Sequence, residues 1–295
     1  MERVEIAIIG TGPAGLEAAI TATLRNKKIL LIGDPDLSGK LRKAHRIDNY
    51  LGLPEIAGSD LAEQFRAHLD KMGIEILQDR IGGIYSMGDY FALQGGKDNY
   101  EAETVILASG VVMEKPIPGE QENLGRGVSY CATCDAALYR GKTALVLGYS
   151  PEEEAEVAFL AEVAEKVTYL PQYRAEEYPG LGDATNIVVE KETPLEILKA
   201  DGEMVLKTST GSEYHSNGIF VLREATPPDQ LVPGLGTEGN AVVCDRQMRT
   251  SVEGIFAAGD ITGAPYQYIK AAGEGNIAAL SAVNYLVAKK RNAGA

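Results

Sequence analysis

The chain has 295 residues, of which 45% are hydrophobic and 24% are charged, a composition typical of a soluble globular protein with room for two domains. Its apolar runs are short and broken by glycine or charge, so no transmembrane helix is predicted. A net charge of −14 argues against a nucleic-acid-binding protein, which would carry a basic face. The N-terminus enters an apolar strand without a signal sequence, so we expect a cytoplasmic protein.

The first unit of the chain predicts a dinucleotide-binding turn. Residues 4–9 are a short apolar run typical of a buried strand, and residues 16–24 continue as a helix. Between them, Gly10 suits a tight turn, Gly12 lets a pyrophosphate approach the backbone, and Gly15 lets the helix pack on the strand. The pyrophosphate would bind at the helix N-terminus.

The following segments predict the rest of an α/β domain. The next strand, residues 28–32, should end in an acid that binds the ribose, but Gly33 holds that place and Asp34 comes one residue later. Residues 59–72 form an amphipathic pattern that predicts a helix capped by Ser59 or Asp60.

Antiparallel strands are predicted between residues 74 and 101, because that segment alternates apolar and polar residues between glycines. Residues 104–107 then form another buried strand, which ends in the turn at Ser109 and Gly110.

A second strand–turn–helix unit resembles an internal repeat of the first. It consists of an apolar strand at 143–148, a turn at 149–151 and a helix at 152–166. Proline-containing segments near 116–119 and 227–239 are predicted linkers, and the segment 251–260 and a helix at about 267–289 close the chain. The chain is therefore expected to leave its first domain, form a second, and return.

Two cysteines separated by two residues lie just after the first linker. Cys131 and Cys134, followed by Asp135, can form a reversible disulfide beside a group that exchanges the thiol proton, and a helix starting at Asp135 would favour the thiolate. A zinc site is the alternative, but it needs four ligands, and only Cys244 and scattered histidines remain. We interpret Cys244, which follows an apolar run, as a buried core thiol.

These motifs together resemble the low-molecular-weight flavin thioredoxin reductases over nearly the whole chain. The resemblance implies an α/β fold with two Rossmann-like domains with parallel sheets, the second inserted into the FAD-binding domain. We place the FAD-binding domain at 1–114 and 236–295 and the redox-disulfide domain at 115–235. The resemblance also implies a homodimer.

The resemblance further implies which residues bind FAD and which transfer electrons. The FAD-binding residues would be Gly10, Gly12, Pro13, Ala14, Gly15, Asp34, Lys40, Leu41, Asn49, Ser109, Gly110, Gly259, Asp260, Gln267 and Tyr268. Cys134 would face the flavin, Cys131 would attack the disulfide of thioredoxin, and Asp135 would carry the proton. Where the family has an arginine before the glutamine, this chain has Tyr266.

The second domain lacks the family's NADPH-binding elements. Its glycine-rich turn reads GYSPEE at residues 148–153, and the arginine cluster after the next strand is replaced by LPQY at 170–173, leaving Arg174. A later turn reads LREAT at 222–226 in place of glycine and histidine. Glutamates in the first helical turn would repel a diphosphate, so we predict that the NADPH site is degenerate.

The chain is therefore similar to the ferredoxin-dependent branch of the family. A basic stretch of Lys40, Arg42, Lys43 and Arg46 would attract an acidic ferredoxin, which would supply two electrons one at a time. The linkers would act as hinges between the flavin and thioredoxin steps. The alternatives are an NADPH-dependent reductase, a reductase that uses another donor such as a reduced deazaflavin, and a flavin-binding redox sensor without turnover.

Overall fold

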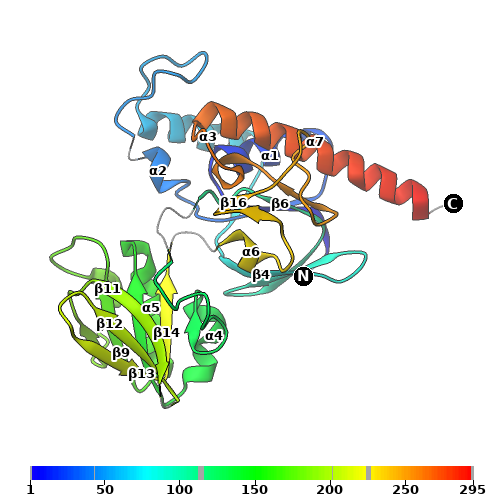
Figure 1. Ribbon diagram of the computed structural model, residues 1–295. Coiled ribbons are helices and arrows are strands. Elements are labelled where there is room, and N and C mark those ends of the chain that lie inside the picture. Colours follow the sequence, from blue (N-terminus) through cyan, green and yellow to red (C-terminus); the bar gives the residue numbers. More distant parts are fainter. Residues whose placement is uncertain (1, 43, 112–115, 201, 224–226, 294–295) are drawn as a thin grey trace. The chain divides into compact units, whose positions relative to one another are not determined.

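The structure is a computed structural model, and it describes residues 2–42, 44–111, 116–200, 202–223 and 227–293, apart from the side chains of Lys40, Cys134, Glu152 and Ala293. The chain divides into two compact units, drawn in Figure 1. Unit 1 comprises residues 1–111 and 227–295, and unit 2 comprises residues 112–226. A search of the described residues for a helix long and apolar enough to span a membrane finds none.

Unit 1 is built on a seven-stranded sheet. Its strands are β1 (Val4–Ile9), β2 (Ile29–Ile32), β3 (Ile76–Leu77), β4 (Ile81–Ser86), β5 (Phe91–Gly95), β6 (Asn99–Leu107) and β17 (Ile255–Ala257). The order is β3-β2-β1-β6-β5-β4, and β17 pairs with β6. Strands β3, β2, β1, β6 and β17 run parallel, whereas β4, β5 and β6 pair antiparallel. Two short strands, β15 (Thr237–Glu238) and β16 (Ala241–Val242), form a separate pair.

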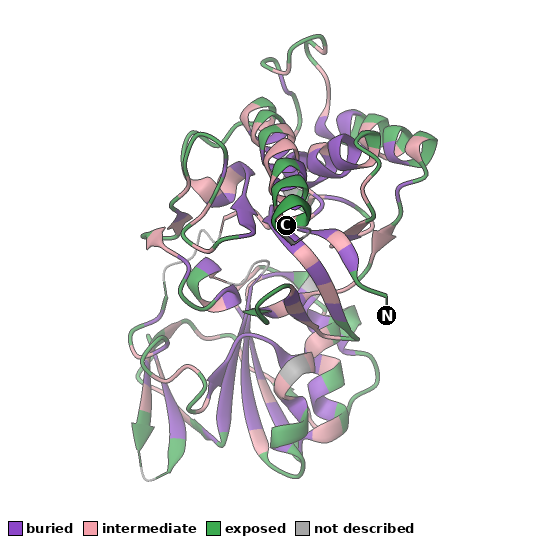
Figure 2. Cartoon of the chain, turned by 90° about the vertical axis from the view of Figure 1, so that its right-hand side faces the viewer, coloured by how far each residue is buried: buried purple, intermediate pink, exposed green. Residues whose placement is uncertain are grey.

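The longer helices cover one face of this sheet, and one short helix packs on the other. The helices of unit 1 are α1 (Pro13–Leu24), α2 (Gly39–Arg42), α3 (Gly58–Met72), α6 (Pro228–Leu231), α7 (Tyr268–Ala293) and the 3-10 turn η4 (Gly259–Thr262). Alternate residues of β1 point to opposite faces: Ile6 and Ile8 pack with α1, α3 and α7, whereas Ala7 and Ile9 pack with β4, β5 and α6. Figure 2 shows the resulting buried strands and the exposed outer sides of the helices.

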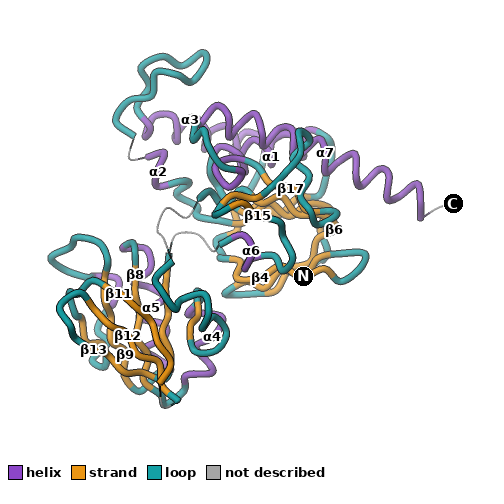
Figure 3. Tube along the Cα trace, in the orientation of Figure 1, coloured by secondary structure: helices purple, strands orange, loops and turns teal. Residues whose placement is uncertain are grey.

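Unit 2 has a parallel sheet with a smaller antiparallel sheet on one face. The parallel sheet has the order β10-β9-β8-β14-β7, formed by β7 (Val128–Ser129), β8 (Thr143–Gly148), β9 (Lys166–Pro171), β10 (Ile187–Val189) and β14 (Gly218–Leu222). The second sheet consists of β11 (Pro194–Ala200), β12 (Glu203–Thr208) and β13 (Glu213–Ser216). The helical segments are α4 (Ala132–Asp135), α5 (Glu154–Val163), η1 (Ala136–Tyr139), η2 (Pro151–Glu153) and η3 (Pro179–Leu181), as the trace in Figure 3 shows. The α/β class with parallel sheets is as predicted from the sequence.

The boundaries between the units differ in part from the predicted ones. The predicted first boundary, at 114/115, falls within residues 112–115, outside the described part. The predicted second boundary, at 235/236, lies too late in the chain, because Leu231, Val232 and Leu235 pack into the core of unit 1. Unit 1 therefore resumes at residue 227.

Three local predictions are also corrected. The N-cap of α3 is Ala57, without a side-chain cap, in place of Ser59 or Asp60. The helix expected to begin at Asp135 begins at Ala132 and is a single short turn, followed by the 3-10 turn η1. Cys244 lies beyond β16 and is only half-buried, with its side chain against the core, so it is not the fully buried thiol that we predicted.

Candidate active site

The predicted FAD-binding residues of unit 1 gather at one edge of its sheet. The turn with Gly10 follows β1, Ser109 and Gly110 follow β6, and Gly259 and Asp260 follow β17. Because these strands are parallel, their carboxyl ends meet at the same edge, which is where open α/β sheets bind ligands.

Close backbone packing explains two of the glycines in the first turn. Gly10 has a φ of +115°, and a Cβ there would lie 2.2 Å from the carbonyl oxygen of Ala108. A Cβ on Gly15 would lie 1.9 Å from the carbonyl oxygen of Gly10, so only glycine lets α1 approach β1 this closely. The roles of tight turn and close packing that the sequence assigned to Gly10 and Gly15 match this geometry.

The N-terminus of α1 has the features of a phosphate-binding site. Its N-cap is Gly12, no side chain caps the free N–H groups, and the first turn contains no acidic residue. A Cβ on Gly12 would meet only the Cβ of Ser38, at 4.0 Å, so this glycine keeps open a space that the protein does not fill. The hydroxyl of Ser109, at the same sheet edge, is buried without a hydrogen-bond partner. Unsatisfied donors and an open cradle fit a dinucleotide.

Two other predicted ligands are already engaged by the protein. Asp34 accepts a hydrogen bond from the backbone N–H of Asp36 at 2.7 Å, which closes its own turn, and its carbonyl accepts one from the Thr11 hydroxyl at 3.0 Å. Leu41 is fully buried in the core, which leaves its main chain for a cofactor. The side chain of Lys40 lies outside the described part.

The structure brings the distant loop residue Asn49 to the start of α7. The amide of Asn49 donates a hydrogen bond to Oε1 of Gln267, the residue predicted to lie beside the isoalloxazine. Tyr268 follows, and burial together with the nearby Asp260 carboxylate raises the pKa of its hydroxyl. Asn49 and Gln267, which are far apart in sequence, are thus in direct contact, and their contacts with the flavin stay a prediction.

Two residues that sequence reasoning missed hold the turn that carries Asp260. Glu274 accepts a hydrogen bond from the backbone N–H of Gly259 at 2.9 Å. Lys270 pairs with Glu274 at 3.2 Å and donates to the carbonyls of Gly259 and Gly263 at 3.1 and 2.8 Å. Their spacing of four residues on a helix was a signal in the sequence, but it indicates only a surface ion pair.

In unit 2, the cysteine pair lies at the end of β7. Cys131 is buried and disulfide-bonded, whereas Cys244 is free. The side chain of Cys134 lies outside the described part, so its pairing with Cys131 stays a prediction. The Sγ of Cys131 is 3.4 Å from the hydroxyl of Thr133.

Asp135 is held close to this turn by Ser129. The Ser129 hydroxyl donates to Oδ2 of Asp135 at 2.7 Å, and Oγ of Ser129 accepts a hydrogen bond from the backbone N–H of Cys131 at 3.2 Å. From the other side, Glu156 on α5 accepts a hydrogen bond from the backbone N–H of Ala132 at 3.0 Å. Sequence reasoning missed Ser129 and Glu156, because neither belongs to a recognisable motif.

Glu154 lies in the first turn of α5 in the second strand–turn–helix unit, next to the place where a dinucleotide-binding domain holds a diphosphate. It is 3% exposed; Oε1 accepts a hydrogen bond from the Tyr173 hydroxyl and Oε2 one from the N–H of Gly180 at 2.6 Å. Tyr169 donates to the Tyr173 hydroxyl at 3.1 Å, and its own hydroxyl would lie 2.6 Å from a Cβ on Gly148.

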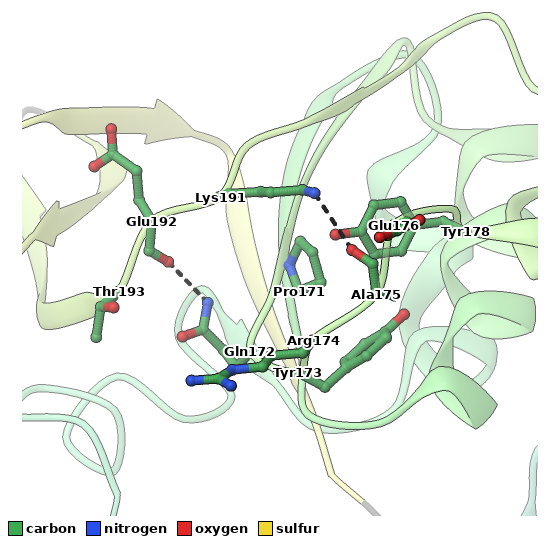
Figure 4. Close-up of a pocket in the computed structure, with 10 residues that line it drawn as sticks. All are labelled: Pro171, Gln172, Tyr173, Arg174, Ala175, Glu176, Tyr178, Lys191, Glu192 and Thr193. Atoms are coloured by element: carbon green, nitrogen blue, oxygen red, sulfur yellow. Dashed lines mark hydrogen bonds between the residues drawn. The ribbon is translucent and has the colours of Figure 1, made fainter.

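The side chains that would face a 2′-phosphate line a cavity of about 630 Å³ (Figure 4). Two cationic residues, Arg174 and Lys191, are matched there by two acids, Glu176 and Glu192. The Lys191 ammonium donates to the carbonyl of Ala175 at 3.3 Å, as Figure 4 shows. The lining is balanced in charge, unlike the arginine cluster that a phosphate requires.

Comparison with known proteins identifies the family. The sequence matches the pyridine nucleotide-disulphide oxidoreductase family over residues 4–275. It is 33% identical to the thioredoxin reductase of Bacillus subtilis over 298 residues, which cover 96% of this chain and 94% of that protein. The chain belongs to the thioredoxin reductase family.

Solved structures of thioredoxin reductases share this fold. A ferredoxin-flavin thioredoxin reductase from Clostridium acetobutylicum is 48% identical, with a TM-score of 0.90 over 98% of this chain and 99% of that one. A thioredoxin reductase from Gloeobacter violaceus is 29% identical, with a TM-score of 0.84 over 98% and 96% of the two chains.

These comparisons confirm several predictions made from the sequence. The protein is an oxidoreductase, a flavoprotein of the thioredoxin reductase family with FAD as cofactor and thioredoxin as substrate. The carboxyl-edge turns of unit 1 have the open glycine cradle and the free N–H groups that fit this cofactor. In unit 2, the cysteine turn contains the disulfide-bonded Cys131.

Proposed function

We propose that this thioredoxin reductase takes its electrons from reduced ferredoxin and passes them through FAD and a disulfide between Cys131 and Cys134 to thioredoxin. The observation that carries the proposal is the buried Glu154 carboxylate in the first turn of α5. A diphosphate binds where helix N–H groups are free and negative charge is absent. Here the turn carries a fixed carboxylate, so NADPH would meet both repulsion and lost hydrogen bonds.

Two further features of this turn also disfavour binding of NADPH, one by occupying space and one by removing a hydrogen-bond donor. The hydroxyl of Tyr169 occupies the space beside Gly148 that a close-approaching pyrophosphate would need. Pro151 at the start of η2 removes an N–H donor from the turn. The predicted third element of the nucleotide site, residues 222–226, lies partly outside the described residues, at 224–226.

A second line of support comes from the relatives. The solved structure with 48% identity is a ferredoxin-flavin thioredoxin reductase, whereas the Bacillus subtilis thioredoxin reductase is 33% identical. Nothing in the described residues favours the NADPH-dependent, deazaflavin-dependent or sensor alternatives over ferredoxin.

The proposed ferredoxin surface is less basic than its sequence suggested. Arg42 is half-exposed and lies 3.6 Å from Asp36, and Arg46 pairs with both Asp48 and Glu55 at 2.7 Å. Lys43 and the side chain of Lys40 lie outside the described part. Because Arg46 is doubly neutralised, we propose that steering depends on Lys40, Arg42 and Lys43 rather than on Arg46.

The redox steps in unit 2 follow from the cysteine turn. The glycine turn at the N-terminus of α1 would hold FAD, which would supply the two electrons for reduction of the disulfide. Two electrons and two protons open the Cys131–Cys134 bond, with Asp135 as the proton carrier. The Cys131 thiolate then attacks a sulfur of oxidised thioredoxin, and Cys134 attacks Cys131, which releases reduced thioredoxin and restores the disulfide.

We further propose a homodimer, as the resemblance to the family implied. Ile269 and Ile277 lie two turns apart on α7 and are 42% and 39% exposed. An apolar stripe of this kind is suited to burial against a second copy. Sedimentation equilibrium measures the mass directly, and a monomer at micromolar concentration would refute this part of the proposal.

The donor is tested by anaerobic mixing of the oxidised holoenzyme with NADPH and, separately, with reduced ferredoxin. We expect ferredoxin to bleach the visible flavin band and oxidised thioredoxin to restore it, with no bleaching by NADPH. Rapid bleaching by NADPH would overturn the proposal, and silence with both would indicate another donor.

Neutralising the basic residues tests the docking surface. Lys40→Gln with Arg42→Gln should lower the rate of flavin reduction by ferredoxin and its dependence on salt. The matched control removes two exposed positive charges elsewhere, through Lys71→Gln and Lys166→Gln. Equal effects in both double variants would show that net charge, and not this surface, controls the rate.

A further inference from the structure

The hydroxyl of Ser129 contacts both ends of the cysteine turn. It lies on β7 and is 5% exposed. Its oxygen accepts from the backbone N–H of Cys131 and donates to Oδ2 of Asp135 at 2.7 Å, the distance of a strong hydrogen bond to a carboxylate. One hydroxyl therefore holds the first cysteine and the acid that follows the second.

Ser129 is itself fixed to the centre of unit 2. Strand β7 pairs in parallel with β14, with Ser129 opposite Phe220, which is fully buried. Groups that must be held to a fraction of an ångström are best supported from sheet strands rather than from loops. The cysteine turn has little regular structure of its own, because α4 is only one turn long. The hydrogen bond from Ser129 therefore fixes the carboxylate of Asp135 relative to the sheet.

The hydrogen bond also determines which carboxylate oxygen can move a proton. A serine hydroxyl has one proton to donate, and the shortest contact directs it to Oδ2 of Asp135. Oδ1 has no hydrogen bond to any other described side chain, so it remains able to exchange a proton with a thiol. Without the hydroxyl, the carboxylate can rotate, and the productive geometry is populated less often.

We propose that Ser129 is a positioning residue for proton transfer by Asp135 during the dithiol–disulfide exchange. This inference rests on the proposed redox steps, but not on the identity of the electron donor. It makes Ser129 act through Asp135 and not on the sulfur atoms directly.

A double-mutant cycle in single-turnover reoxidation tests this coupling. Holoenzymes of wild type, Ser129→Ala, Asp135→Asn and the double variant are reduced photochemically, which removes any dependence on ferredoxin, and then mixed with oxidised thioredoxin. Recovery of the flavin band gives the rate constant and its dependence on thioredoxin concentration.

We expect Ser129→Ala to slow maximal reoxidation about tenfold to a hundredfold, as loss of a hydrogen bond to a charged group implies. Half-saturation by thioredoxin should stay unchanged, and the substitution should have no further effect in the Asp135→Asn background. Ser129→Thr, which keeps the hydroxyl, should restore most of the rate.

The matched control is Ser216→Ala, which removes another buried hydroxyl of unit 2, one that donates to the carbonyl of Gly218 at 2.9 Å. Its rate should equal that of wild type. If Ser129→Ala slows both backgrounds by the same factor, Ser129 has a structural role only and the inference is wrong. If wild type itself is not reoxidised by thioredoxin, the proposed function fails instead.

Discussion

The hydroxyl of Tyr173 donates a hydrogen bond to the buried carboxylate of Glu154, across nineteen residues of sequence. Because of this contact, the first turn of α5, where an anion could otherwise bind, already contains the negative charge of the Glu154 carboxylate. The N–H of Gly180 completes the coordination of the carboxylate. A dinucleotide would have to displace this buried acid, and this contact is therefore the basis of the proposed loss of the NADPH site in unit 2.

Removing the Tyr173 hydroxyl should therefore affect stability and not electron transfer. In Tyr173→Phe, one oxygen of a buried carboxylate loses its donor, which costs about 1–3 kcal/mol of unfolding free energy. Turnover with thioredoxin should stay within twofold of wild type. Urea unfolding followed by circular dichroism measures the change. The control is Tyr178→Phe, whose hydroxyl has no hydrogen bond among the described residues, and equal losses in the two variants would contradict the role of Glu154.

Substitution of two glycines of unit 1 should show which of them is needed for FAD binding and which for folding. Gly12→Ala adds a methyl group where the fold has room, so we expect normal stability of the apoprotein but at least tenfold weaker FAD binding, because the methyl occupies the phosphate cradle. Gly275→Ala places a Cβ 2.1 Å from the carbonyl oxygen of Ala14, which should separate α1 from α7 and destabilise the unit. FAD titration and thermal unfolding distinguish the two. Normal FAD affinity in Gly12→Ala would show that the cradle lies elsewhere.

Local patterns predicted the frame of the molecule. The apolar strand before Gly10 and the strand at 143–148 have the predicted positions. A short apolar run followed by a turn is a pattern of consecutive residues, so it can be recognised from the sequence alone. The helices predicted at 59–72 and at about 267–289 are found at 58–72 and 268–293, and the amphipathic pattern predicted the first of them. These elements needed only near neighbours to form.

The features that could not be predicted from the sequence depend on contacts between residues far apart in the chain. Glu154 is an ordinary first-turn acid until Tyr173 and Gly180 fold against it, and the sequence does not show that it is buried. Ser129 has no motif of its own and acquires a role only because the turn returns Asp135 to its hydroxyl. The predicted second boundary failed for the same reason, since the apolar residues after 227 find their partners in a sheet formed much earlier in the chain.

A buried ion pair joins the start and end of unit 2. Arg223 donates to both oxygens of Glu120 at 2.6 and 2.9 Å, and Glu120 also accepts from the Tyr130 hydroxyl and from the N–H of Ile117. Burial alone would raise the pKa of Glu120, but the hydrogen bonds and charge of Arg223 lower it overall. Tyr130 immediately precedes Cys131, so this pair supports the cysteine turn.

We expect Arg223→Leu to cost about 3–5 kcal/mol of unfolding free energy, since it leaves the carboxylate of Glu120 buried without its cation. Adding Glu120→Gln should recover a large part of that loss, because glutamine is neutral and still accepts from Tyr130 and Ile117. Urea denaturation of the holoenzyme measures each variant. If the double variant is as unstable as Arg223→Leu alone, the loss of stability comes from altered packing and not from the unpaired charge of Glu120.

Acid stability should depend on Glu5, which anchors β1 to α7. Burial raises the pKa of its carboxyl, but hydrogen bonds from Lys290, the N–H of Lys28 and Lys27 outweigh this and lower the pKa to about 2, against 4.5. A lowered pKa stabilises the fold above pH 4.5, and that contribution is lost as the pH falls from 4.5 towards 2. In Glu5→Gln, the fall in unfolding free energy between pH 5 and pH 2.5, measured by urea denaturation, should be smaller by about 1 kcal/mol after solvent screening. Parallel curves for the two proteins would contradict the assignment.

Replacing the attacking thiol should divide the reaction into its two halves. Cys131→Ser removes the sulfur that we propose bonds to thioredoxin but leaves the turns of unit 1 intact, so turnover with thioredoxin should vanish while reduced ferredoxin still bleaches the flavin. The matched control is Cys244→Ser, which alters a free, half-buried cysteine of unit 1 and should retain full turnover. Anaerobic stopped-flow absorbance follows both steps in one experiment. Loss of flavin reduction in Cys131→Ser would mean that the donor reaches the flavin only through the disulfide, and the proposed order of electron transfer would be reversed.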